Sequence, residues 1–529
     1  MDTKPLPLRP NLEQYKKQAK DLLKGFRSSQ PDAVQRARNF HPRFAQGSGS
    51  PLGPAKFLLA DAQLVIAREH GFESWPKFVQ RIEVINSEIA ANVNPVAAFI
   101  KAAIWHGTLD AAEAILAAHP EIARESIHVA AILGDDAAVR RFISADPRNA
   151  AKKEAPYDGD ALVYLCLSKY LRLDKTRSEA FLRAATALLD AGADPNTGFR
   201  AKDEYGDFET ALYGAAGVAH HADLTRLLLE RGADPNDNET FYHAPETYNN
   251  AALKVLVESG KMRADLLAGM LLRKADWHDY EGAKYLLEHG ADPNQMSRWG
   301  YTALHQALRR DNALEIIELM LDHGADPAIN TVADGGSGIV IAAHRGRRDV
   351  LELLRRRGIA IGLPGVDRLI VACAQNDEDA VRAIAAGEPK LVHELLTQGG
   401  KLLAEFAGTD NTEGVRLLLD LGVKVTALYE GDGYFGIPRE STALHVAAWK
   451  AWHKTVKFLI ERGAPVNAVD GNGHTPLQLA VRACVDSYWT NRRSPESMEA
   501  LLRAGASAEG IDLPTGYPEM DELLKAYLR

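Results

Sequence analysis

The stretch GYTALHQALRRDNALEIIELMLDHGADPAIN, residues 300–330, carries the signals of a complete helix–turn–helix unit. Thr302 precedes an Ala- and Leu-rich segment, and threonine is a common N-cap of a helix. The run EIIELML has the apolar spacing of a second helix. Gly324 follows it at the position where many helices end in a residue of left-handed backbone conformation, which glycine adopts at little energetic cost. ADPAIN then opens a turn. The stretch therefore predicts two short helices joined by a turn, followed by a longer connection.

Both halves of this stretch recur along the chain. Two antiparallel helices of about 33 residues cannot bury both faces alone, but stacked copies can. The first half returns as ETALYGAA (209–216), STALHVAA (441–448) and HTPLQLAV (474–481). The second half returns as LLDAGADPN (188–196), LLERGADPN (228–236), LLEHGADPN (286–294), LIERGAPVN (459–467) and LLRAGASAE (501–509).

The two phrases, in this order and spacing, resemble the ankyrin repeat. The resemblance implies an all-α fold, an α-solenoid of about twelve ankyrin-like helix–turn–helix repeats. It also implies a concave groove used chiefly to bind other macromolecules.

The strength of the pattern varies along the chain and suggests domain boundaries. Residues 1–90 have helical periodicity without the repeat, and we expect a helical N-terminal capping domain whose GFESWPKFV phrase resembles a leader of bacterial ankyrin arrays. The remaining segments are degenerate repeats (95–150), ankyrin-like repeats with long turns (157–328), divergent repeats (335–425), ankyrin-like repeats with an insertion at 484–497 (440–509) and a C-terminal cap helix (510–529).

Composition narrows the class of protein. The chain is 46% hydrophobic and 25% charged, as a folded globular protein is, and has no run of about 18 apolar residues that would span a membrane. Its three cysteines are far apart and its start lacks a secretory h-region, which together favour a cytoplasmic location. The net charge of −9 disfavours nucleic-acid binding. Residues 1–43 are the exception, with ten Lys/Arg against four Asp/Glu. We interpret them as a solvated helix face, and the alternative is a contact with an acidic partner or nucleic acid.

No established catalytic, phosphate-binding or metal-binding motif occurs, so we predict no catalytic residue, no metal site and no cofactor. His305 is the residue that first suggests an acid/base group. Aligned repeats place Tyr213, Val340, His445 and Gln478 at its position, and the position resembles the histidine that steadies the turn in ankyrin repeats. We therefore predict a structural role for five residues: Thr302, His305, Thr442, His445 and Thr475.

Aromatic residues make up only 7% of the chain but gather in the long turns. Aromatic side chains are frequent anchors of binding surfaces, and nearby carboxylates would favour a cationic ligand. The alternative is that each loop folds over its own aromatics. The predicted partner-binding residues are Phe199, Tyr205, Asp207, Phe208, Phe241, Tyr242, Trp299, Tyr301, Tyr429, Asp432, Tyr434, Phe435, Trp449, Trp489 and Arg492.

Two functions remain open at this point. The favoured one is a binding scaffold that recognises a protein or peptide partner through its concave face and its long aromatic and acidic turns. The alternative is an enzyme or small-molecule binder whose long loops form a pocket, with acid/base groups drawn from Asp207, Glu209, Glu430, Asp432 and neighbouring tyrosines.

Overall fold

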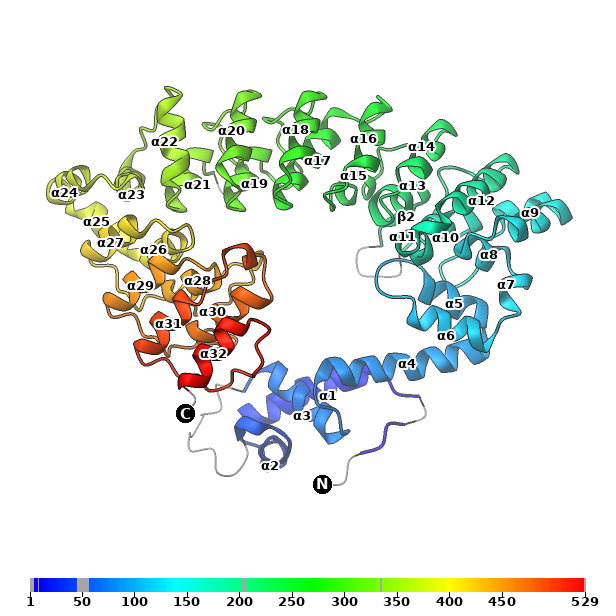
Figure 1. The fold of residues 1–529 in the computed structure, drawn as a ribbon, viewed down its shortest axis with the longest axis horizontal. Helices are drawn as coiled ribbons and strands as arrows, with labels where there is room; N and C mark the ends of the chain where they lie inside the picture. Colours follow the sequence, from blue (N-terminus) through cyan, green and yellow to red (C-terminus); the bar gives the residue numbers. More distant parts are fainter. Residues whose placement is uncertain (1–3, 8, 45–56, 202–205, 334, 528–529) are drawn as a thin grey trace. The chain divides into compact units, whose positions relative to one another are not determined.

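The computed structural model describes residues 4–7, 9–44, 57–201, 206–333 and 335–527 (Figure 1). The chain divides into two compact units, Met1–Met262 and Arg263–Arg529. Both consist of helices stacked in pairs, as an all-α solenoid requires. The described strands form a single two-stranded sheet.

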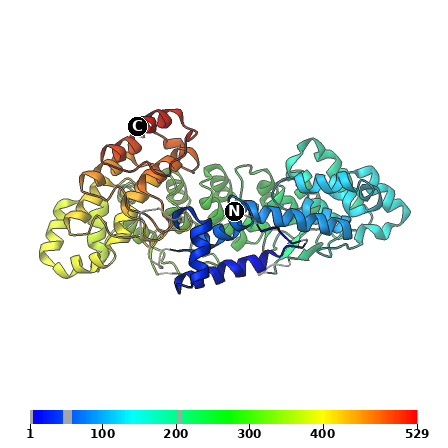
Figure 2. The same cartoon turned by 90° about the horizontal axis from the view of Figure 1, so that it is seen from below.

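The N-terminal unit begins with helices that have a core of their own. Asn11 caps the first helix by accepting from the backbone N–H groups of Glu13 and Gln14. Tyr15, Phe26 and Phe78 are buried in the core of this segment. The last of these helices then continues to the first repeat-like pair (Figure 2). The elements are α1 (Leu12–Arg27), α2 (Pro31–Phe40), η1 (Pro42–Phe44), α3 (Leu59–Glu69) and α4 (Trp75–Val93).

The rest of this unit is a stack of helix pairs interrupted by one hairpin. Strands β1 (Gly198–Arg200) and β2 (Phe208–Thr210) pair antiparallel in the long turn, with Phe199 opposite Glu209. The helical elements are α5 (Pro95–Ala103), α6 (Asp110–Ala118), α7 (Ile122–Glu125), α8 (Ile127–Leu133), α9 (Asp136–Ala145), η3 (Pro147–Ala151), α10 (Ala161–Cys166), α11 (Lys169–Leu173), η4 (Lys175–Arg177), α12 (Ser178–Asp190), α13 (Ala211–Tyr213), the π-helical turn η5 (Gly214–Val218), α14 (Ala222–Glu230), α15 (Thr240–His243) and α16 (Ala251–Glu258).

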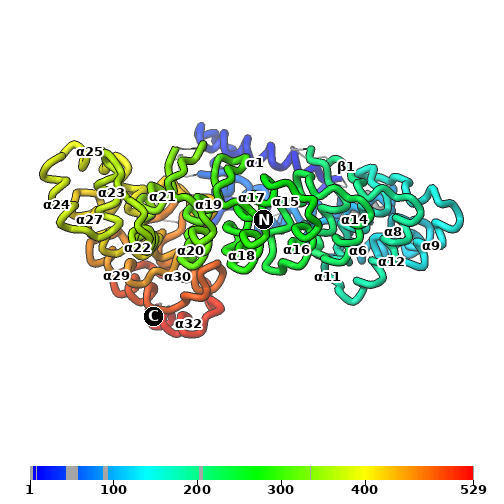
Figure 3. Tube along the Cα trace, turned by 90° about the horizontal axis from the view of Figure 1, so that it is seen from above, coloured from blue at the N-terminus to red at the C-terminus, as the bar shows by residue number. Residues whose placement is uncertain are grey.

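The C-terminal unit opens with regular helix pairs (Figure 3). The Asp and Asn residues that recur in the turns have a local structural role. Asp292 accepts from the backbone N–H of Asn294 at 2.8 Å and so tightens its own turn. The side chain of Asn294 then donates to Gly324 O at 2.8 Å and accepts from Asp326 N at 2.7 Å, which ties this turn to the next one. The helices are α17 (Ala264–Asp276), α18 (Tyr280–Glu288), α19 (Ala303–Arg309), α20 (Leu314–Asp322), α21 (Gly338–His344) and α22 (Arg348–Arg356).

The regular stacking changes where the repeat wording is weakest. Phe406 packs against Gly346, where a Cβ would lie 2.7 Å from its ring. The side chain of Asn411 donates to both Gly346 O and Ala374 O at 2.9 Å. α21 therefore meets α26 directly, and α24 and α25 lie at the edge of the unit (Figures 1 and 3). The helices are α23 (Gly365–Gln375), α24 (Glu378–Gly387), α25 (Pro389–Thr397), α26 (Gly399–Ala407) and α27 (Thr412–Asp420).

The last repeats return to the regular pattern and carry the insertion. His453 donates from Nε2 to Arg492 O at 3.0 Å, and its Nδ1 shares a hydrogen bond with Ser497 Oγ at 2.6 Å, so the insertion is tied to the preceding repeat. The elements are α28 (Ala443–Trp449), α29 (His453–Glu461), α30 (Pro476–Val485), η6 (Thr490–Arg492), α31 (Glu496–Arg503) and α32 (Pro518–Tyr527).

Candidate functional site

A buried cluster of charges joins distant repeats of the C-terminal unit. Arg345, just after α21, donates from Nε and Nη2 to the two carboxylate oxygens of Asp311 at 2.6 and 2.7 Å. Lys450, just after α28, donates to Asp311 Oδ2 at 2.6 Å. Because Asp311 and Lys450 are 139 residues apart, this contact brings the ends of α19 and α28 together.

Further groups complete the cluster. Arg345 also pairs with Glu405 at 2.9 Å, and Glu405 accepts from the hydroxyl of Tyr429 at 2.9 Å. The charges are largely removed from water, since the side chain of Lys450 is only 2% exposed. Buried charges are tolerated when each is paired and hydrogen-bonded, as here.

Burial and pairing shift the titration of these groups. Burial alone raises the pKa of Asp311, but the charges of Arg345 and Lys450 outweigh it and hold that pKa well below its usual range. Burial lowers the pKa of Lys450, and the charge of Asp311 acts against that shift. Burial raises the pKa of Tyr429, and the neighbouring Glu405 carboxylate raises it further. Asp311 is therefore a carboxylate at neutral pH, as the two cations require.

The loop at 427–440 covers this cluster with aromatic rings. The ammonium of Lys450 lies 3.7 Å from the ring centroid of Phe435, within cation–π range. The guanidinium of Arg310 lies 3.6 Å from the ring of Tyr434, whose hydroxyl donates to Asp276 O at 2.6 Å. The loop is thus fixed to the ends of α17 and α19 as well as to its own repeat.

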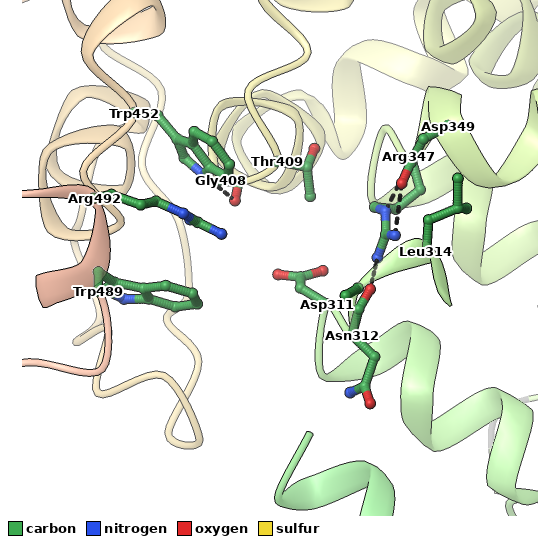
Figure 4. A pocket seen from close by; sticks show the side chains of 11 residues that line it. Asp311, Asn312, Leu314, Arg347, Asp349, Gly408, Thr409, Trp452, Trp489 and Arg492 are labelled. Carbon is green, nitrogen blue, oxygen red and sulfur yellow. Dashed lines mark hydrogen bonds and ion pairs between the residues drawn. The ribbon is translucent and has the colours of Figure 1, made fainter. Parts of the chain in front are cut away.

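Two cavities open beside the covered cluster. The larger is about 360 Å³ and is lined by aromatic side chains and a histidine. The smaller is about 190 Å³, is lined by charged side chains and two indoles, and appears in Figure 4. Trp489 lines both cavities. The lining of the larger one is His278, Tyr434, Phe435, Gly436, Trp449, Tyr488 and Trp489.

The structure brings most of the predicted partner-binding residues of this unit to these cavities. Tyr434, Phe435 and Trp449 line the larger, Arg492 lines the smaller, and Trp489 lines both. Trp449 also donates its indole N–H to Phe435 O at 2.6 Å, which joins the loop to α28.

Four other predicted residues of the C-terminal unit lie outside both linings. Asp432 shapes the loop by accepting from Tyr434 N at 2.9 Å, and Tyr429 is buried below it. Trp299 and Tyr301, on an earlier turn, are covered by the guanidinium groups of Arg298 and Arg309 respectively.

The predicted residues of the N-terminal unit lie in different surroundings. Phe199 is buried, stacked on Tyr157 with ring centroids 4.9 Å apart and with Trp105 edge-on at 5.7 Å. Phe241 is also buried, so both rings act as internal packing in this structure. Phe208 is exposed, Asp207 and Tyr242 are partly buried, and Tyr205 lies outside the described residues.

The predicted structural residues hold the starts of the first helices. Thr302 is the N-cap of α19, and its backbone N–H donates to Nδ1 of His305 at 3.1 Å. Nε2 of His305 donates to Ile329 O at 2.9 Å, in the next turn. Thr442 and His445 repeat this arrangement, with Ala468 O as acceptor at 3.1 Å. At Thr475 the side chain of Gln478 takes the same place.

Sequence reasoning missed the charges of the cluster. Asp311, Arg345, Lys450 and Glu405 were not predicted, although a signal exists. In aligned repeats Arg310, Arg345 and Lys450 occupy the same position, directly after the first helix. The repeat fold needs no particular charge at this turn position. A cationic residue that recurs there indicates that these positions share a similar environment.

The four carboxylates of the enzyme alternative do not converge on these cavities. Asp207 and Glu209 belong to the N-terminal unit, and neither Glu430 nor Asp432 is in the lining of these two cavities. Within the described ranges there is no group of three or more His, Cys, Asp or Glu side chains arranged to hold a metal ion. No helix in that part of the chain is long and apolar enough to cross a membrane.

Comparisons with known proteins place the repeats in a family. A family model for ankyrin repeats in three copies matches residues 271–364, and one for many copies matches residues 444–486. The human transient receptor potential cation channel subfamily A member 1 is 25% identical over 294 residues, covering 53% of this chain and 23% of that protein. Human ankyrin repeat and SOCS box protein 6 is 30% identical over 171 residues, covering 32% and 35%.

A solved structure, the human ASB11 ankyrin repeat domain, is 22% identical to this chain. The match covers 50% of this chain and 98% of that domain, with a TM-score of 0.23.

The chain spans between 8% and 35% of the length of the curated relatives it matches. Those relatives come from animals and a virus, so they do not support the bacterial origin expected from the leader phrase. The repeat wording, the helix pairs and the two family models agree that residues 271–364 and 444–486 are ankyrin repeats.

Proposed function

We propose that this chain is a non-catalytic scaffold that binds a protein or peptide partner through the concave face of its C-terminal unit. Ankyrin repeats as a class act in protein–protein interaction, which supports a macromolecular partner. The contact surface would be the lining of the 360 Å³ cavity, which we call the aromatic surface.

The observation that carries the proposal is the convergence of two departures from the repeat. The loop at 427–440 and the insertion at 484–497 both contribute to the aromatic surface. Tyr434 is 40% and Tyr488 is 57% exposed, although both are large rings fixed among other rings. Rigid, partly exposed aromatic side chains bury much area at low entropic cost and are frequent hot spots of binding.

The cavity also suits a partner's side chain. Its volume lies at the lower end of the range of about 300–1,000 Å³ for small-molecule pockets. His278 is neutral at physiological pH, because burial lowers its pKa to about 4, and the remaining lining is aromatic apart from Gly436. An apolar or aromatic side chain of an extended segment therefore fits it better than a charged group.

Two further assignments accompany the proposal. A cytoplasmic location is supported by the three cysteines, all of which are buried and unpaired. A capping role for residues 1–90 is supported by the separate core of α1–α4, since the ends of a solenoid must cover an apolar face.

Peptide display against the purified full chain tests the proposal. We expect selected peptides to bind the unsubstituted chain and to lose at least tenfold in affinity in Tyr488→Ala, as loss of a hot spot of about 2 kcal/mol would give. The control is Tyr248→Ala, which removes a tyrosine of similar exposure, 61%, from the N-terminal unit. Equal loss in both variants, or none in Tyr488→Ala, would reject the aromatic surface as the site.

A further inference from the structure

The smaller cavity contains a half-buried arginine, Arg492, whose surroundings are unlike those of the buried cations Arg345 and Lys450. The guanidinium of Arg492 lies 3.8 Å from the ring of Trp452 and 4.8 Å from that of Trp489. Figure 4 shows it between the two indoles, directed into the cavity toward Asp311. Stacking on two rings fixes the plane of the guanidinium and therefore the direction of its N–H donors.

Neighbouring groups hold this arrangement in place. Trp452 donates its indole N–H to Gly408 O at 2.8 Å, which fixes that ring. His453 contacts the carbonyl of Arg492 at 3.0 Å and so fixes the backbone. The arginine is thus positioned before any ligand arrives, which reduces the entropic cost of binding.

The donors of Arg492 are largely unused. Within the described part of the chain its guanidinium donates from Nη1 to Lys450 O at 3.3 Å, and no carboxylate lies within ion-pair distance of it. The other charges of the lining are already paired, Asp311 with Arg345 and Lys450, and Asp349 with Arg347 at 2.8 Å. Burial lowers the pKa of Arg492, and the charges of Tyr488, Asp311 and Asp410 offset only part of that shift.

The size and charge of the cavity limit what can bind there. About 190 Å³ is smaller than a typical small-molecule pocket, so one functional group fits better than a whole cofactor. A carboxylate matches the planar fork of a guanidinium. A phosphate dianion would place a second negative charge beside Asp311 and Asp349, which line the same cavity.

We propose that Arg492, held between Trp452 and Trp489, binds the side-chain carboxylate of an aspartate or glutamate in the partner peptide. This inference rests on the proposed function and specifies the partner further. Because Trp489 lines both cavities, the bound segment would place an acidic residue close to the apolar or aromatic residue that enters the aromatic surface.

Direct binding of a small carboxylate to the purified full chain tests the site without a partner. The probe is sodium propionate, observed by saturation-transfer NMR at constant ionic strength, with propionamide as its neutral isostere. We expect a saturable signal from propionate, at least a tenfold weaker response from propionamide, and competition by N-acetylglutamate amide. A propionate response no stronger than that of propionamide would overturn the proposal.

Variants separate the arginine from its neighbour. Arg492→Gln should weaken propionate at least tenfold, whereas Arg493→Gln, an exposed arginine of the same insertion, should leave it unchanged. If Arg492→Gln melts at a lower temperature, Arg492→Lys serves instead, because it keeps the charge and loses the fork. Unchanged propionate binding in a folded Arg492 variant would contradict the assignment.

The peptides selected by display identify the source of the carboxylate. Replacing their Asp or Glu with Asn or Gln should weaken binding at least tenfold in the unsubstituted chain and by less than twofold in Arg492→Gln. If propionate binds but this replacement has no effect, the site takes a free carboxylate and the partner assignment is wrong. If peptides require Tyr488 but propionate does not bind, the proposed function stands and this inference fails.

Discussion

The turn at 197–209 and the loop at 427–440 have similar compositions and different surroundings. Phe199 of the first is packed against aromatic rings of its own unit, including Tyr157 and Trp105. Tyr434 of the second donates to Asp276 O, 158 residues away, and both Tyr434 and Phe435 line a cavity. An aromatic loop therefore becomes a surface or a core according to whether the array brings a distant repeat opposite it.

The difference has a cause in the middle of the C-terminal unit. Where α21 meets α26, the array turns and the end of α19 comes opposite the end of α28. In the N-terminal unit the hairpin β1–β2 instead covers helices next to it. Four predictions test this comparison, from the largest expected effect to the smallest.

Asp311→Asn should have the largest effect, because it leaves Arg345 and Lys450 buried without their shared carboxylate. Breaking a buried ion pair from one side costs about 3–5 kcal/mol. Chemical denaturation should show this loss in the C-terminal unit. Asp322→Asn, which removes one carboxylate from the exposed pair with Arg357, should cost less than about 1 kcal/mol. A similar small loss in both variants would mean that the cluster does not hold the unit together.

Phe199→Ala should lower the free energy of unfolding by about 3 kcal/mol, because it leaves a cavity among packed rings. Peptide binding at the aromatic surface should not change. Tyr488→Ala should behave in the opposite way, with a stability change within about 1 kcal/mol at an exposed position and a clear loss of binding. Loss of binding in folded Phe199→Ala would remove the contrast between the two loops.

Acidification should weaken the C-terminal unit through His278. Burial lowers its pKa from 6.5 to about 4, so the folded state holds fewer protons than the unfolded state between these values. Stability is then complete above about pH 6.5 and falls as the pH drops toward 4, with a loss of about 1–2 kcal/mol near pH 5. Denaturation curves of His278→Asn should lack this component of the pH dependence. An unchanged pH profile would show that His278 is accessible to protons in the folded state.

His305→Ala should have a small effect, about 1–2 kcal/mol for the two buried hydrogen bonds of its ring, with peptide binding intact. His445→Ala is the matched variant in a repeat with the same geometry and should give a similar loss. Thermal melting measures both. Loss of peptide binding in a fully folded His305→Ala chain would reopen a functional role for that residue.

The parts of the fold that depend on local spacing could be predicted from the sequence. Thr302 and His305 are three residues apart, and the Asp and Asn of the turn act on their own turn or the next one. The sequence of one repeat therefore suffices to explain the local structure of that repeat and its link to the next turn.

The site could be predicted only in part. Tyr434, Trp489 and Arg492 stood out because they depart from the repeat, but nothing in their spacing shows that they meet. The contact between Lys450 and Asp311 depends on how α21 meets α26, in the segment where the repeat wording is weakest. Phe199 could not be distinguished from Phe435, since both are aromatic residues in long turns and both are buried. Only their neighbours differ, because Phe199 stacks on Tyr157 whereas Phe435 lines a cavity.

The most direct test of the central claim is site-specific photo-crosslinking of a selected peptide to the full chain. A benzophenone side chain would replace either Tyr488 in the insertion or Tyr248 in the N-terminal unit, two positions of similar exposure. The account predicts a peptide crosslink from position 488 that excess unlabelled peptide abolishes, and none from position 248. A specific crosslink from position 248, with none from position 488, would contradict it.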